Sequence, residues 1–143
     1  MKSYLVILVV FVSFFDLDAQ HLKFNHYNDK NGLSHNSVRH IVQDQQGFLW
    51  LGTFSGLNRF DGYQFKSDLL SSSVDSEIYK ADITGMELDP STHNMWIGTN
   101  KGLLLFNTAT HELVDFLHNK GGQDSFPYEE VRAVHIDRHK KVW

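Results

Sequence analysis

The chain has 143 residues, with 13 lysines and arginines against 17 aspartates and glutamates, nine histidines and no cysteine. This length allows one domain at most, and 41% hydrophobic against 21% charged residues predicts a packed core instead of disorder. The net charge of −4 and the lack of a basic cluster argue against a nucleic-acid surface, and the lack of cysteine excludes disulfides, thiolate metal sites and cysteine nucleophiles.

The first nineteen residues have the pattern of a secretory signal peptide. Met1-Lys2-Ser3 carries one positive charge, and an uncharged apolar run of twelve residues follows at Tyr4–Phe15. The run is shorter than the stretch of about 20 apolar residues that crosses a bilayer as a helix. We therefore expect residues 1–19 to direct export to the periplasm or cell surface, with cleavage after Ala19. A buried strand or helix is the alternative.

A short segment at 22–27 (LKFNHY) resembles the outermost strand of the repeat that follows it. Phe24 precedes Val38 by 14 residues, much as Phe116 precedes Val131 by 15. The sequence predicts an orphan outer strand at 22–27, without a sheet of its own.

A pattern of 46 to 47 residues repeats along the rest of the chain. Each tryptophan is preceded by an apolar run that ends in aspartate, and the first two are followed by Gly-Thr, Gly-Leu and an aromatic residue. The shared positions are Asp44, Trp50, Gly52, Thr53 and Gly56 in the first copy, Asp89, Trp96, Gly98, Thr99 and Gly102 in the second, and Asp137 and Trp143 in the third. A period of this size is typical of the blades of a β-propeller.

Each complete copy is expected to form four short antiparallel strands. The predicted strands are 38–44, 49–53, 57–60 and 63–66, then 83–89, 95–99, 103–106 and 112–117, and finally 131–137. The aspartate is expected to bond turn amides, and the glycine after tryptophan to allow close backbone approach. The tryptophan is expected to lie in the core between blades, with a stacking surface for sugar rings as the alternative.

The predicted fold is therefore an all-β, incomplete β-propeller at residues 20–143. Blade one is expected at about 36–68, blade two at about 81–118 and the start of blade three at 130–143. Closed propellers typically have about 4–8 blades, so the chain is expected to be the N-terminal part of a larger ring.

Three segments resemble the repeat of the two-component regulator propeller family: Gly32–Val38, Trp50–Thr53 and Gly56–Gly62. The second copy departs from that repeat in its turn at Pro90–Asn94, which is one residue longer than the turn of the first copy. The resemblance covers about residues 22–143. It implies a seven-bladed periplasmic sensor of Bacteroidetes hybrid histidine kinases, which often detect oligosaccharides.

The same resemblance implies the partners of the chain. They are the remaining blades of a longer parent chain and an oligosaccharide, with membrane contact only through the signal peptide or a downstream helix. No nucleic acid, cofactor or metal is expected.

The residues able to carry chemistry form no catalytic pattern. His135 and His139 have the spacing of a metal pair on a helix, but they fall on a predicted strand and the turn after it. Arg59 is the candidate ligand-facing residue, because it replaces the aliphatic Leu105 of the second copy and stands beside Asn58, which we expect to be exposed. A solvated strand arginine is the alternative.

The sequence favours a non-enzymatic sensor fragment that binds a glycan and signals across the inner membrane. One alternative is a fragment of a secreted propeller enzyme, either a quinoprotein dehydrogenase or a polysaccharide lyase. The tryptophan of quinoprotein repeats, however, lies in a different sequence context. Another alternative is a non-functional product of a truncated gene.

Overall fold

The computed structural model describes residues 22–67, 79–117 and 130–143. The predicted signal peptide lies outside these residues, as do the predicted blade ends at 68 and 118. Within them the regular structure is a short 3-10 helix, η1 (Asp29–Asn31), and eight strands.

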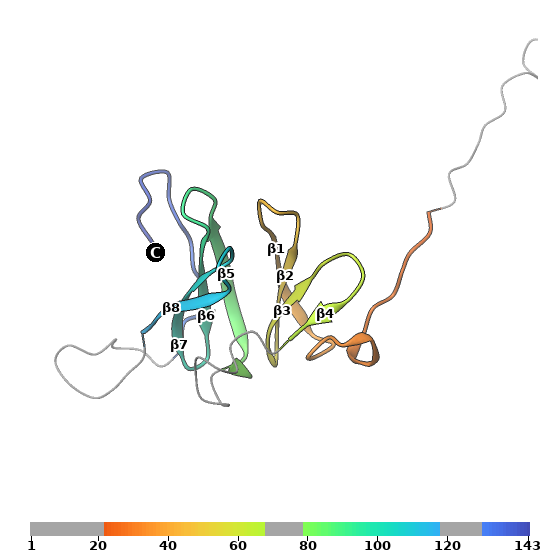
Figure 1. The fold of residues 1–143 in the computed structure, drawn as a ribbon. Helices are drawn as coiled ribbons and strands as arrows, with labels where there is room; N and C mark the ends of the chain where they lie inside the picture. Colours follow the sequence, from red (N-terminus) through yellow and green to blue (C-terminus); the bar gives the residue numbers. More distant parts are fainter. Residues whose placement is uncertain (1–21, 68–78, 118–129) are drawn as a thin grey trace, which may run out of the picture.

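The strands form two four-stranded antiparallel sheets, each in chain order. Blade one contains β1 (Val38–Gln43), β2 (Leu49–Thr53), β3 (Gly56–Phe60) and β4 (Phe65–Lys66), and blade two contains β5 (Ile83–Asp89), β6 (Asn94–Thr99), β7 (Gly102–Asn107) and β8 (Glu112–Leu117). Figure 1 shows the blades side by side, with β5 packed against β1 and β2. The predicted all-β class is confirmed.

The two blades match each other down to the register of their strands. In blade one Trp50 lies opposite Arg59, and in blade two Trp96 lies opposite Leu105. The first strand of each blade also carries an irregularity at its second residue, where the register shifts between Val38 and His40 and between Ile83 and Gly85. The sequence repeat is therefore also a structural repeat.

The hydrophobic core lies between the blades, because a sheet buries its apolar face only against another element. Blade one contributes the fully buried Trp50 and Leu57. Blade two contributes Ile83, Met86, Met95, Ile97, Leu104 and Phe106. The Trp50 and Phe106 rings meet edge to face, with centroids 5.3 Å apart, so the first tryptophan lies in the inter-blade core, as the sequence predicts.

Glycine lets neighbouring blades approach closely. A Cβ atom at Gly52 would lie 2.6 Å from both Ile83 Cγ2 and Met86 Sδ, which belong to the next blade. At Gly98 it would lie 2.9 Å from Val131 Cγ1. Both glycines thus stand where a side chain would push the following blade away, which is the close approach that the sequence predicts.

Four predicted strands (38–44, 57–60, 95–99 and 103–106) differ from the observed ones by one residue at one or both ends, and three others differ more. Residues 22–27 form no strand; instead the Tyr27 ring packs edge to face on Phe60 and Phe65. The predicted strand at 63–66 shortens to β4, because Asp61 bonds the amides of residues 63 and 64 and so makes them a turn.

The third difference concerns the predicted strand at 131–137, which makes a single β-bridge between Ile136 and Val142. Amides in this segment are divided between two partners. Val131 N bonds Thr99 O of blade two, and His135 N bonds Trp143 O. A strand needs consecutive pairing along one partner, which this division does not give.

Candidate functional site at the joint between the blades

The turn between β1 and β2 is built around the carboxylate of Asp44. This group accepts hydrogen bonds from Gln46 N at 2.9 Å, Phe48 N at 3.0 Å and Trp50 Nε1 at 2.7 Å. Asp44 is 7% exposed and Trp50 is fully buried. One carboxylate therefore ends the strand, closes the turn and fixes the indole that enters the core.

The third copy repeats this geometry. Asp137 accepts from His139 N at 2.8 Å, Lys141 N at 3.0 Å and Trp143 Nε1 at 3.0 Å. In both copies the aspartate and the tryptophan are six residues apart.

Blade two departs from it. Asp89 stands seven residues before Trp96, and its carboxylate accepts from Ser91 N at 2.9 Å, Ser91 Oγ at 2.7 Å and Lys140 Nζ at 2.6 Å. The longer turn exchanges the bond to the indole for one to the next copy of the repeat.

Arg59 lies in the joint between the blades. Its guanidinium Nη1 is 2.8 Å from Nε2 of His111 in blade two, and its Cζ lies 4.5 Å from the centre of the Phe48 ring. The sequence singles out Arg59 as ligand-facing. The structure places its guanidinium against the neighbouring blade, at the turn between β7 and β8. That it faces a ligand stays a prediction.

The prediction that Asn58 is exposed is wrong. Asn58 is fully buried, and its Oδ1 accepts from Ser34 N at 2.9 Å while its Nδ2 donates to Ser34 Oγ at 2.7 Å. Ser34 Oγ also lies 2.8 Å from Thr53 Oγ1. Residues before the first strand cover this face of blade one, which a pattern confined to one strand does not reveal.

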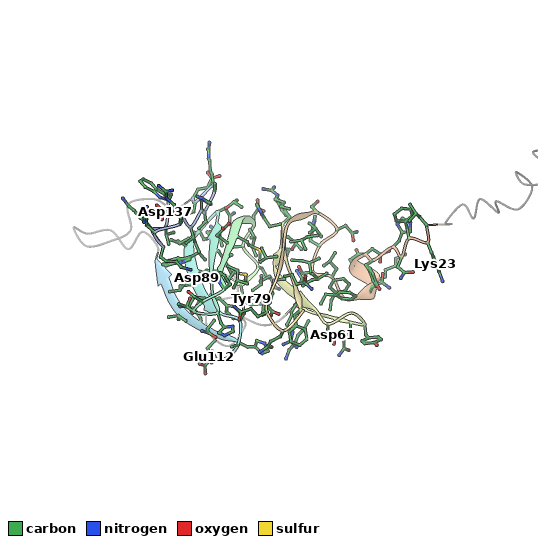
Figure 2. The ribbon with its side chains drawn as sticks, turned by 90° about the horizontal axis from the view of Figure 1, so that it is seen from above. Lys23, Asp61, Tyr79, Asp89, Glu112 and Asp137 are labelled. Atoms are coloured by element: carbon green, nitrogen blue, oxygen red, sulfur yellow. The ribbon has the colours of Figure 1, made fainter. Side chains whose placement is uncertain are left out.

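A polar hollow opens beside this buried network. It has a volume of about 400 Å³ and is lined by Ser34, Ser55, Ser67, Tyr79 and Lys80. It lies at the end of the blade where β2 turns into β3 and the chain enters blade two; Figure 2 shows Tyr79 between the sheets. No sequence motif marks these residues, because they come from four separate segments of the chain.

A second hollow, of about 270 Å³, is apolar. It lies between blade two and the third copy, and its lining includes Trp96, Val134 and Trp143. Trp143 is 66% exposed, so this part of the third copy is far less covered than the equivalent part of blade one.

Within the residues that the structure describes, no group of three or more histidines and acidic residues is arranged to hold a metal ion. In the same residues, no helix is long and apolar enough to cross a membrane.

Comparison with protein families identifies the first repeat. Residues 32–55 match the model of the family described as "Two component regulator propeller". These residues contain Asp44, Trp50, Gly52 and Thr53, whose contacts with the turn and the next blade are given above.

Two similar proteins are more than 30% identical to this chain over the matched residues. Histidine kinase P4 of Formosa agariphila is 43% identical over 70 residues, which are 46% of this chain and 5% of the kinase. The crystal structure of the extracellular domain of the hybrid two-component system BT3049 from B. thetaiotaomicron is 31% identical, with a TM-score of 0.67, and the match covers 83% of this chain and 17% of that domain.

A further solved structure supports the fold alone. The extracellular domain of BT4673 from B. thetaiotaomicron matches with a TM-score of 0.57 at 16% identity, over 87% of this chain and 22% of that domain. The chain thus spans less than a quarter of the solved domains and one twentieth of the curated kinase. The matched parts of the two solved structures lie in extracellular domains.

Proposed function

Because residues 32–55 match the two component regulator propeller family, we propose that the chain forms part of a periplasmic, ligand-sensing propeller of a hybrid two-component system. The observation that carries this proposal is the 31% identity over 83% of the chain to the extracellular domain of such a system. In the proposal, residues 1–19 direct export, and the parent protein passes a binding signal across the inner membrane.

The proposed ligand is a glycan. Propellers bind ligands where loops of several blades converge, and the polar hollow lies at such an end of blade one. Its serine hydroxyls, the Tyr79 hydroxyl and the Lys80 ammonium are groups that hydrogen-bond sugar hydroxyls and, through the ammonium, an acidic sugar. Ser34 is held in place by its bonds to Asn58 and Thr53, so one wall of the hollow is fixed before a ligand arrives.

The proposed partners within the parent protein are its further blades. Trp50 packs against Phe106 of the next blade, and Trp96 lines the apolar hollow at the equivalent place. Phe106 lies on the third strand of blade two. By analogy, the apolar hollow beside Trp96 is suited to an aromatic side chain from the third strand of a following blade.

Calorimetric titration of the sensor domain with acidic and neutral oligosaccharides tests whether the ligand is a glycan. We expect Lys80→Gln to weaken binding of an acidic oligosaccharide at least tenfold. Lys101→Gln is the matched control, because Lys101 is an exposed turn lysine of blade two. If the two variants bind the acidic oligosaccharide with equal affinity, the hollow is not its binding site. If the sensor domain binds no oligosaccharide at all, the ligand is not a glycan.

A further inference from the structure

The turns of blade two and of the third copy reach back to the preceding blade through residues in an unusual backbone conformation. The turns of blade one that follow β1 and β3 use Gly47 and Gly62 at φ of 90° and 96°. The corresponding turns further along use His111 at φ 61° and Lys140 at φ 65°. Residues with side chains rarely adopt this left-handed region, and such strain is informative where it positions a functional group.

Both of these side chains contact the blade before them. Lys140 Nζ lies 2.6 Å from Asp89 Oδ1, and His111 Nε2 lies 2.8 Å from Arg59 Nη1. The His111 ring also packs on the Trp50 ring in a T-shaped arrangement, with centroids 5.9 Å apart. The unfavourable turn conformation thus directs the imidazole onto the joint described above.

The chemistry of the Arg59 contact fixes the charge of the histidine. A guanidinium only donates hydrogen bonds, so Nε2 of His111 must accept, and the imidazole must be neutral. A proton taken up from solvent would occupy that nitrogen. It would remove the acceptor, break the bond to Arg59 Nη1 and leave two cations side by side.

The groups that face His111 favour this neutral form. Burial lowers the pKa of the imidazole, and the nearby charges of Arg59 and Lys66 lower it further, while Asp44 acts in the opposite direction. Asp44 is held by the turn amides and the Trp50 indole, so its carboxylate already has partners.

We propose that the Arg59–His111 contact is an acid-sensitive joint, closed when the imidazole is neutral and opened when it is protonated. The joint connects β3 of blade one to the turn before β8 of blade two. Acidification of the medium therefore weakens the contact between the two blades at β3 and the turn before β8. The apolar core around Trp50, which includes Leu57 of β3 and Phe106 of β7, also holds the two blades together.

The direction of the effect follows from linkage. The histidine of the unfolded chain has a pKa near 6.5, and that of the folded chain is lower. Stability from the joint is complete above 6.5 and is lost as the pH falls from 6.5 to the folded pKa, because the unfolded chain takes up the proton first. Below the folded pKa no further loss occurs.

The test compares urea unfolding midpoints of the full chain at pH 7.5 and pH 5. We expect the midpoint of the wild-type chain to fall more on acidification than that of His111→Gln, whose amide can still accept from Arg59 but does not titrate. His93→Gln is the control, because His93 has the same left-handed conformation (φ 58°) and its backbone carbonyl accepts hydrogen bonds from Thr108. Equal pH dependence in the wild-type and His111→Gln chains would overturn the proposal.

A second measurement covers the case in which a variant does not fold. The imidazole of His111 in the wild-type chain is titrated by NMR, and we expect a midpoint below 6.5 that rises in Arg59→Met. A wild-type midpoint at or above 6.5 would overturn the proposal.

Discussion

The Trp50 indole nitrogen donates a 2.7 Å hydrogen bond to the Asp44 carboxylate, and both side chains are buried. The bond joins the turn that ends β1 to the core that holds blade two. The spacing of six residues between the two positions permits it, and the third copy repeats it between Asp137 and Trp143.

Removal of the carboxylate should destabilise the chain more in blade one than in blade two. We expect Asp44→Ala to lower the free energy of unfolding by about 1–3 kcal/mol, because the buried indole N–H and two turn amides lose their acceptor. Asp89→Ala is the comparison, since Asp89 bonds the exposed Lys140 and no indole. Urea denaturation measures both; a larger loss for Asp89→Ala would contradict this account.

The indole itself should contribute more than its hydrogen bond. Trp50→Ala removes a fully buried side chain from the core between the blades, and large-to-small changes of this kind cost about 3–5 kcal/mol. Calorimetric melting of the variant checks this. A loss below about 1 kcal/mol would indicate that Trp50 is exposed in solution, which would reopen its interpretation as a stacking surface for sugars.

Alanine at Gly47 or at Gly52 of blade one should destabilise the chain less than alanine at Gly56. Gly47→Ala meets no atom within 4 Å and carries only the strain of its positive φ, about 1–2 kcal/mol. Gly52→Ala meets the movable side chains of Ile83 and Met86, for which overpacking costs about 1–3 kcal/mol.

Gly56→Ala should be the most harmful of the three. It combines a φ of 97° with a clash against the backbone carbonyl of Tyr79, which side-chain rotation cannot relieve. Thermal melting of the three variants gives the order. If Gly56→Ala melts no lower than Gly47→Ala, then the chain entering β5 does not lie against this turn.

The buried amide of Asn58 should protect the segment before β1. Asn58→Ala removes the acceptor of Ser34 N, so we expect hydrogen exchange of the Ser34 amide to accelerate and the free energy of unfolding to fall by about 1–3 kcal/mol. Asn107→Ala in blade two is the control, because its bonds lie within its own blade. Unchanged exchange at Ser34 would show that the segment is held by other contacts.

The contact between Lys140 and Asp89 should make the stability of the chain depend on pH in the acidic range. The ammonium of Lys140 holds the pKa of the Asp89 carboxylate well below its usual value of 3.8, with Ser91 acting in the same direction. Stability from this pair is present above 3.8 and is lost as the pH falls through the folded pKa. We expect Lys140→Met to raise the Asp89 pKa, measured by carboxylate NMR, whereas Lys141→Met should leave it unchanged.

The sequence determined the parts of this protein that depend on neighbours along the chain. The spacing of Asp44, Trp50, Gly52 and Gly56 is enough to predict strands, turns and the repeat, because hairpin pairing within a blade joins residues that are close in sequence. The longer turn after Asp89 is also visible there, although its consequence, the exchange of an indole partner for Lys140, is not.

Only the tertiary structure decided what lies between the blades. Arg59 and His111 are 52 residues apart, and Asn58 is buried by a segment 24 residues before it. A strand pattern predicts which face a side chain occupies but not what covers that face. For the same reason residues 22–27 have the pattern of a strand but form none: a strand exists only where a partner edge accepts its backbone hydrogen bonds.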